Sequence, residues 1–281
     1  MPPVASEQGA WVEPTTRRTL RYRLWHPQSP RALLVVIHGF GEHSGRYEAF
    51  AQPLVEQGVV VAAADLWGHG RSSGARGDLG DLPRCIDNLI TLTQQVFLPA
   101  SGQTTYTLFG HSMGGLLAAY WALHRPAELH HAILQSPLLE VGFPIPAWKT
   151  LAAIVLARAW PSCRIQVQLD VSILSHDPAV VEAYRVDPLV HHIMSARTHR
   201  SLLHTRDEVR DHAEAIRTPL WVLCGAEERV ISVSHVQQWY ARLTCEKHLY
   251  IFPDCYHELH HEPIRNEVFR LITDSIVGTP T

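Results

Sequence analysis

The chain has 281 residues, of which 46% are hydrophobic and 18% charged, and its formal net charge is −3. Such a composition is typical of a globular protein with one large domain, or with one domain and an insertion. No run of basic residues is present, so the sequence gives no sign of a nucleic-acid partner.

The cysteines and the N-terminus bear on the compartment. Five cysteines without a C-x-x-C spacing do not predict a disulfide framework, and they favour a reducing, cytoplasmic setting. The first residues lack the basic and apolar regions of a signal peptide. The sequence contains no stretch of 18 uncharged apolar residues, so no transmembrane helix is expected. The sequence does not indicate an oligomeric state.

The first part of the chain alternates apolar runs with a helical segment. Residues 19–27 alternate in polarity and predict an edge strand, and residues 32–39 form a continuous apolar run that ends in glycine. Residues 47–58 predict a helix that ends at Gly58. Residues 59–74 begin as a second apolar strand and end in a glycine-rich polar loop. Strand, helix and strand in this order indicate parallel, buried strands.

The same alternation continues to the end of the chain, apart from one long interruption. We expect further strands at 105–112, 131–137, 219–225 and 247–253, and helices at 82–97, 113–126 and 262–277. This order predicts an α/β fold with a mostly parallel central sheet flanked by helices.

Residues 138–215 interrupt the alternation because they contain no convincing buried strand. We expect a helical cap there, inserted into a core that residues 1–137 and 216–281 form. Residues 148–160 are nearly all apolar, but the segment is too short to span a bilayer. It is expected to pack between cap and core. The alternative is a lipid-facing lid that makes peripheral contact with a membrane or micelle.

A G-x-S-x-G pattern at Gly110, Ser112 and Gly114 lies between an expected strand and an expected helix. A sharp strand–turn–helix strains the backbone of the serine and leaves little room for side chains two residues away on either side. Glycines at those two positions meet that need. The pattern predicts a nucleophilic Ser112, and the alternative is a serine that only caps the following helix.

A nucleophilic serine needs a base and an acid that orients the base. Two late strands end in suitable residues, at the sheet edge where catalytic groups of α/β folds gather. Glu227 and Glu228 follow the strand at 219–225. The strand at 247–253 is followed by Asp254, His257, His260 and His261. The attacked carbonyl also needs two backbone N–H donors, which we expect from Met113 and from Phe40 in the glycine-rich loop HGFGEHSGRY, residues 38–47.

Four segments carry a resemblance to a known family. HGFGEHSGRY, DLWGHGRSSG, GHSMGG and CYHELHHE, in this order, resemble the monoacylglycerol lipase and lysophospholipase group of α/β-hydrolases over residues 30–272. The resemblance implies the α/β-hydrolase fold, a helical cap over the active site, and hydrolysis of monoacyl lipid esters without a metal or organic cofactor.

Matching motifs carry the roles of the family residues over to this chain. Ser112 is expected to be the nucleophile and His257 the base, with Phe40 and Met113 as the oxyanion hole. The residues implied in contact with the alcohol part of the substrate are Glu42, Arg46 and His260.

One position departs from the family pattern. The family usually has aspartate just before arginine after the sixth strand, whereas this chain has Glu228 there. Glutamate is one methylene longer, but it supplies the same ionised carboxylate. Glu228 is therefore the expected acid of the triad, and Glu227 is the weaker candidate.

Several other functions are weighed against a monoacylglycerol lipase. A lysophospholipase and a general short- or medium-chain carboxylesterase would use the same triad. HELHH at 257–261 also matches the H-E-x-x-H signature of zinc proteases, but that motif needs a continuous helix, and Pro253 and Pro263 flank it closely. A non-catalytic binding protein of this fold is the alternative from a different class.

Overall fold

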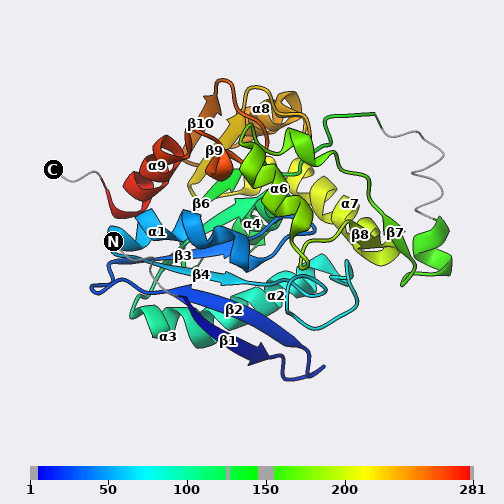
Figure 1. Ribbon diagram of the computed structural model, residues 1–281, viewed down its shortest axis with the longest axis horizontal. Helices are drawn as coiled ribbons and strands as arrows, with labels where there is room; N and C mark the ends of the chain where they lie inside the picture. The colour runs from blue at the N-terminus through cyan, green and yellow to red at the C-terminus, as the bar shows by residue number, and fades with distance from the viewer. Residues whose placement is uncertain (1–5, 125–126, 145–154, 279–281) are drawn as a thin grey trace.

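The computed structural model describes residues 6–124, 127–144 and 155–278 (Figure 1). In this part of the chain a central sheet of eight strands runs in the order β1-β2-β4-β3-β5-β6-β9-β10. The strands are β1 (Glu7–Val12), β2 (Thr19–Trp25), β3 (Ala32–Ile37), β4 (Val59–Ala64), β5 (Tyr106–His111), β6 (Leu129–Gln135), β9 (Leu220–Gly225) and β10 (Lys247–Phe252). From β4 to β10 all neighbours are parallel, which confirms the mostly parallel α/β sheet.

The N-terminal side of the sheet corrects one expectation. The segment 19–27 was expected at the sheet edge, but β2 pairs antiparallel with both β1 and β4, so β1 is the edge strand. The alternating polar residues of β2 suggested an edge strand. The same alternation occurs in an interior strand whose sheet has one solvated face, so it does not identify an edge.

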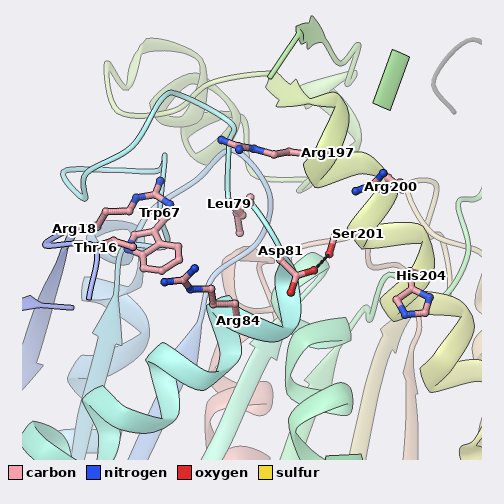
Figure 2. Close-up of a pocket in the computed structure, with 11 residues that line it drawn as sticks. Thr16, Arg18, Trp67, Leu79, Asp81, Arg84, Arg197, Arg200, Ser201 and His204 are labelled. Carbon is pink, nitrogen blue, oxygen red and sulfur yellow. Dashed lines mark hydrogen bonds between the residues drawn. The ribbon is translucent and has the colours of Figure 1, made fainter. Parts of the chain in front are cut away.

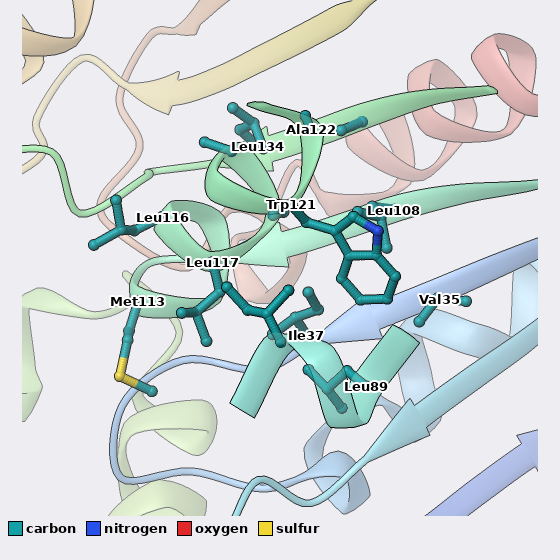
Figure 3. Close-up of a cluster of buried hydrophobic side chains, with 14 of the residues drawn as sticks. Val35, Ile37, Leu89, Leu108, Met113, Leu116, Leu117, Trp121, Ala122 and Leu134 are labelled. Atoms are coloured by element: carbon teal, nitrogen blue, oxygen red, sulfur yellow. The ribbon is translucent and has the colours of Figure 1, made fainter. Parts of the chain in front are cut away.

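Helices cover both faces of the sheet (Figure 1). On one face lie α1 (Glu48–Glu56) and α9 (Arg265–Val277), and on the other α2 (Leu82–Leu92), α4 (Met113–His124) and α8 (Val233–Arg242). Side chains of β3 alternate between the two cores: Leu34 and Val36 pack with the first pair of helices, Val35 and Ile37 with the second group. Figure 3 shows Leu116, Leu117 and Trp121 of α4 on the second face. Helix α2 continues through a π-helical turn (Thr93–Phe97) into α3 (Leu98–Ser101).

The chain between β6 and β9 forms the inserted region. It contains α6 (Pro178–Val186), α7 (Ala196–Asp211), and a small antiparallel sheet of β7 (Arg164–Gln166) and β8 (Ile193–Ser195). We did not expect the two short strands, because β7 is exposed along its whole length and carries no buried pattern. Most of the expected helix at 148–160 lies outside the described residues. Within the described ranges no helix is long and apolar enough to cross a membrane.

Candidate active site

Ser112 lies on a sharp turn between β5 and α4. Its φ is +55°, a left-handed conformation that costs free energy for any residue except glycine. A Cβ at Gly114 would lie 2.0 Å from the Ile37 carbonyl oxygen, and one at Gly110 would lie 2.2 Å from the Gly114 carbonyl oxygen. Backbone bonds from Ser112 N–H to Gln135 and from Leu138 N–H to Ser112 fix the turn at 2.9 and 3.0 Å. The glycines of the motif are therefore required for this close packing.

His257 and Glu228 meet at the carboxyl end of the sheet. His257 follows β10 and Glu228 follows β9, and Nδ1 of His257 lies 2.7 Å from Oε2 of Glu228. The other oxygen of Glu228 accepts the backbone N–H of Val230 at 2.8 Å. Glu227 behaves differently, since its half-exposed carboxylate lies 3.7 Å from Arg229. The structure thus brings Glu228, and not Glu227, to the imidazole.

The charges of this pair shift both pKa values. Burial opposes ionisation of Glu228, but the nearby His257 and the hydrogen bonds outweigh it, so the pKa of Glu228 is lowered. Burial also opposes protonation of His257, yet Glu228, followed by Glu258 and Glu42, raises its pKa above the usual value. The site therefore stabilises the imidazolium form of His257 more than water does, next to an ionised carboxylate.

Ser112 and His257 open into one cavity of about 650 Å³. Gly39 and Phe40 from the end of β3, together with Glu42, His111 and Glu258, form its polar floor. The inserted region supplies a mainly apolar wall: Ile165, Val167, Leu169, Leu174, Tyr184, Met194, Leu202 and Leu203. Ser112 Oγ has no hydrogen-bond partner among the described residues. The hydrogen bond between a catalytic serine and its histidine is often long or poorly aligned before a substrate binds.

Of the two expected oxyanion-hole residues, Phe40 lines the same cavity as Ser112, and Met113 follows Ser112 in the chain. Phe40 lines the cavity with its ring packed edge-on against His69 and His191. Met113 follows Ser112 at the start of α4, and its side chain points into the core (Figure 3). A Cβ at Gly39 would lie 3.5 Å from the His111 carbonyl oxygen, so the loop after β3 packs closely on the serine turn.

A buried ion triad lies beside the cavity. The Arg46 guanidinium donates to Glu42 at 2.7 Å and forms a two-pronged contact with Glu258 at 2.8 and 2.7 Å. Tyr184 of α6 covers this guanidinium, and Cζ of Arg46 lies 4.6 Å from the centre of the tyrosine ring. Burial disfavours ionisation of both carboxylates, but Arg46 outweighs it and their pKa values lie below the usual range. With two carboxylates and one cation, the triad carries a net negative charge.

The expected contact of Arg46 and His260 with the alcohol part of a substrate stays a prediction, although neither side chain lines the cavity. His260 is fully buried and does not line the cavity; its ring stacks on Tyr47, and its Nδ1 accepts from Gln135 at 2.8 Å. Arg46 is held behind Glu42 and Glu258. Both side chains support the cavity wall, whereas Glu42 does line it.

Sequence reasoning missed three residues of the site. Glu258 comes directly after His257 and lines the cavity, but its arginine partner is 212 residues away. His111 packs against His257 with ring centres 4.7 Å apart, and burial lowers its pKa to about 4, so it stays neutral. Ser136 donates to the carbonyl of His257 at 3.0 Å. Of these three residues, only His111 could have been found from the sequence, because it directly precedes Ser112 in the GHS motif.

The HELHH segment does not form the continuous helix of a zinc-protease motif. Only Leu259–His261 are helical, as a single 3₁₀ turn. Its two outer histidines bind different carboxylates: His257 contacts Glu228, and His261 contacts Glu258 at 2.7 Å. The segment therefore belongs to the hydrogen-bond network around the cavity.

The chain is similar to known proteins over most of its length. Residues 28–264 match the family described as serine aminopeptidase, S33. The chain belongs to this family. A monoacylglycerol lipase of Mycolicibacterium smegmatis is 34% identical over 262 residues, which are 92% of each chain. An uncharacterised abhydrolase domain-containing protein of Dictyostelium discoideum is 33% identical over 92% of this chain, which spans only 28% of that protein.

Solved structures share the fold of this chain. The crystal structure of a monoacylglycerol lipase from Paleococcus ferrophilus superposes with a TM-score of 0.85 at 29% identity, covering 92% of this chain and 98% of the other. These similarities confirm the α/β-hydrolase fold and the resemblance to the monoacylglycerol lipase group. As a member of the S33 family, the chain is a hydrolase.

Proposed function

We propose that this chain is a serine carboxylester hydrolase that cleaves monoacylglycerol into a fatty acid and glycerol. The observation that carries the proposal is the buried 2.7 Å contact between Glu228 and His257, whose imidazole lines the same cavity as Ser112 on its strained turn. A nucleophile, a base and an orienting acid are the three parts that acyl transfer by serine needs.

The proposed mechanism uses these groups in two steps. Nε2 of His257 takes the proton of Ser112 Oγ, which attacks the ester carbonyl, and the N–H groups of Phe40 and Met113 stabilise the oxyanion. His257 then protonates the leaving alcohol, and an acyl-enzyme forms. Water, activated by His257, releases the fatty acid and restores Ser112. Glu228 holds the imidazole and stabilises its charged form. Every proton is transferred by side chains of this chain or by water.

The lining from the core and the lining from the inserted region differ in a way that suits a monoacylglycerol. The apolar wall from the inserted region can bury an acyl chain. The floor presents Glu42 and Glu258, whose charge exceeds that of Arg46. A net negative floor accepts hydrogen bonds from neutral hydroxyl groups, and it repels the phosphate of a lysophospholipid. We therefore place neutral glycerol esters ahead of lysophospholipids.

We also propose that the inserted region touches a membrane or micelle surface. Four large apolar side chains of this region are strongly exposed: Phe143, Val155, Trp160 and Val186. Exposed apolar side chains mark a membrane or protein contact where they form one continuous patch, which is the arrangement this proposal requires. The inserted region both lines the cavity and presents these residues, so docking would bring lipid next to the site.

A paired substrate panel tests the assignment. It contains 1-monoacylglycerols of several chain lengths, the matching lysophosphatidylcholines and short p-nitrophenyl esters. We expect the highest kcat/KM on a monoacylglycerol. Preference for the lysolipid would make the chain a lysophospholipase, and activity on short esters alone would leave the triad but remove the lipid assignment. Binding without turnover of any ester would favour a non-catalytic protein.

A further inference from the structure

The backbone N–H of Phe40 has no hydrogen-bond acceptor among the described residues, although Phe40 is partly buried beside the ester cavity. Buried amides are normally paired, so an unpaired one at a cavity is available to a ligand. The direction of this N–H depends on the peptide unit that joins Gly39 to Phe40, because the carbonyl of Gly39 and the N–H of Phe40 belong to the same rigid plane.

Buried side chains hold the backbone on both sides of Gly39. Oε1 of Glu42 accepts the Gly39 N–H at 2.5 Å, and Nδ1 of His38 lies 2.7 Å from the Gly39 carbonyl oxygen. The peptide bond between Gly39 and Phe40 is trans, so its carbonyl and its N–H point in opposite directions. The Phe40 N–H therefore points away from the His38 ring. His38 is 1% exposed and does not line the ester cavity, whereas Gly39 and Phe40 do.

The hydrogen bonds of His38 determine which ring nitrogen carries the proton. The backbone N–H of Leu66 donates to Nε2 at 2.9 Å, so Nε2 is unprotonated and Nδ1–H donates to the Gly39 carbonyl. Burial outweighs the nearby carboxylates of Glu42 and Asp65 and lowers the pKa of His38, which keeps the ring neutral. A donor on the carbonyl also polarises the peptide, and its N–H becomes a stronger donor.

Two further histidines hold the ring of Phe40. His69, in the loop after β4, and His191, in the inserted region, pack edge-on against it with ring centres 6.1 and 5.9 Å away. The His69 ring lies 5.3 Å from that of His38 and 4.6 Å from that of His191, so the three imidazoles form one row. The backbone N–H of His191 also donates to the carbonyl of Gly41 at 2.9 Å. Phe40 is thus held through its peptide and through its ring.

The loop that carries His69 is itself anchored on its outer side. Nδ1–H of His69 donates to the Trp67 carbonyl at 3.0 Å. The indole of Trp67 lines a second cavity, of about 630 Å³, where the Arg18 guanidinium lies over it with Cζ 4.3 Å from the ring centre (Figure 2). The row of histidines therefore rests on a loop that is packed from both sides.

We propose that His38 is a positioning residue of the oxyanion hole: its Nδ1–H holds the Gly39 carbonyl so that the Phe40 N–H faces the oxyanion, while His69 and His191 clamp the Phe40 ring. This inference rests on the proposed function, because it assigns His38 to the same reaction at Ser112. His38 acts through a peptide and does not touch substrate. Its effect therefore falls on the transition state, where the negative oxygen forms, and not on substrate binding.

His38→Asn and His38→Gln separate this role from a merely structural one. The amide nitrogen of asparagine takes the place of Nδ1, so it can still donate to the Gly39 carbonyl. The amide oxygen of glutamine takes the place of Nε2, so it can accept from Leu66 but leaves the Gly39 carbonyl without a donor. Each variant is neutral and keeps one of the two hydrogen bonds. His131→Gln is the control for an amide at a buried histidine position, since His131 is fully buried near the start of β6, away from the site.

The measurements are kcat and KM on a short p-nitrophenyl ester, and Ki for a trifluoromethyl ketone, to which Ser112 adds to give a tetrahedral oxyanion. His38→Gln should lower kcat by about 10–10²-fold with KM little changed, and weaken the ketone by a similar factor. His38→Asn should stay within about threefold of the wild type, and His131→Gln should leave kcat unchanged. Equal losses in the two His38 variants, or a loss confined to KM, would overturn the role of His38.

Two further readouts keep the possible failures apart. Hydrolysis that persists in Ser112→Ala would refute the proposed function, whereas equal losses in both His38 variants with Ser112 still required would refute the positioning role alone. Unfolding curves verify that the variants fold. Heteronuclear NMR of the histidine rings in the wild type needs no variant, and it should show His38 neutral with its proton on Nδ1. A charged His38, or one with its proton on Nε2, would overturn the proposal.

Discussion

Nδ1 of His257 and Oε2 of Glu228 lie 2.7 Å apart, and the two side chains are only 3% and 0% exposed. Glutamate is one methylene longer than aspartate, yet the second carboxylate oxygen of Glu228 still accepts a hydrogen bond from the backbone N–H of Val230. Water is excluded from this contact, so the carboxylate acts on the imidazole in a medium of low dielectric constant. The longer side chain therefore reaches the imidazole and the backbone N–H of Val230 together.

Glu228→Gln is expected to lower kcat by about 10²–10⁴-fold, because an amide neither stabilises the imidazolium nor selects the correct tautomer. Glu228→Asp keeps the charge but shortens the reach, so its loss should be smaller. Initial rates with a monoacylglycerol measure both effects. Glu227→Gln is the matched control and should leave kcat unchanged. A Glu227→Gln loss as large as that of Glu228→Gln would refute the assignment of the acid.

The raised pKa of His257 predicts how activity depends on pH. The neutral imidazole accepts the Ser112 proton, so kcat/KM on a soluble ester should rise with pH through a value above the usual 6.5 of histidine. Glu258→Gln removes one of the carboxylates that raise this pKa, so the rise should move to lower pH.

Glu246→Gln controls for a general loss of negative charge, since Glu246 is exposed and pairs with His248 alone. It should not move the profile. The profiles are recorded with a short p-nitrophenyl ester to avoid effects on lipid dispersion. An acid limb that stays in place in Glu258→Gln would contradict the role of Glu258 in setting the imidazole pKa.

Arg46→Met should destabilise the fold by about 3–5 kcal/mol at pH 8, because two buried carboxylates lose their cation. In the wild type these carboxyls have lowered pKa values, and their stabilisation is lost as the pH falls. In the variant, burial without the arginine charge raises both pKa values above those of the unfolded chain. Protonation then relieves the penalty, so the deficit relative to wild type should shrink at pH 5.

Denaturant unfolding at both pH values measures this difference. Arg185→Met is the control, since Arg185 and Glu182 form an exposed pair on α6 that contributes about 0–1 kcal/mol. An Arg46→Met deficit that is the same at pH 5 and pH 8 would show that lost packing, and not unpaired charge, causes it.

The strained backbone at Ser112 gives a prediction about stability. With φ at +55°, glycine relaxes the strain while alanine keeps it, so Ser112→Gly should be more stable than Ser112→Ala by about 1 kcal/mol. Thermal and urea unfolding of the two variants measure the difference. Both lack the hydroxyl, so any lost hydrogen bond cancels between them. Equal stability would indicate that the turn is not strained at this residue.

Membrane contact through the inserted region is tested by Val155→Glu/Trp160→Glu, which places charges at two exposed apolar positions. We expect less co-sedimentation with phosphatidylcholine vesicles, while kcat on a soluble ester is retained. Val12→Glu, at an exposed position of β1, is the control for surface charge. Identical co-sedimentation of wild type and double variant would argue against docking at this surface.

The parts of the fold that depend on local sequence pattern could be predicted from the sequence. Continuous apolar runs such as residues 32–37 predicted the buried parallel strands, and the glycines around Ser112 predicted the strand–turn–helix. The strand end at Gly225 placed Glu228 correctly, because carboxyl ends of parallel strands share one edge. β1 was missed, since a short, largely exposed strand is defined by its partner and not by its own composition.

Contacts between distant segments could not be read from the sequence. The pairing of Arg46 with Glu258 joins residues 212 apart, and no spacing rule connects them. His260 was expected at the substrate because it follows His257 by three residues, but the chain turns it under the sheet end, against Tyr47.

The most direct test of the account is the initial rate of 1-monoacylglycerol hydrolysis by the wild type and by Ser112→Ala, with unfolding curves that verify both proteins are folded. Loss of nucleophile chemistry should reduce kcat by about 10³-fold or more. Hydrolysis by Ser112→Ala within about tenfold of the wild type would contradict a mechanism in which Ser112 attacks the ester.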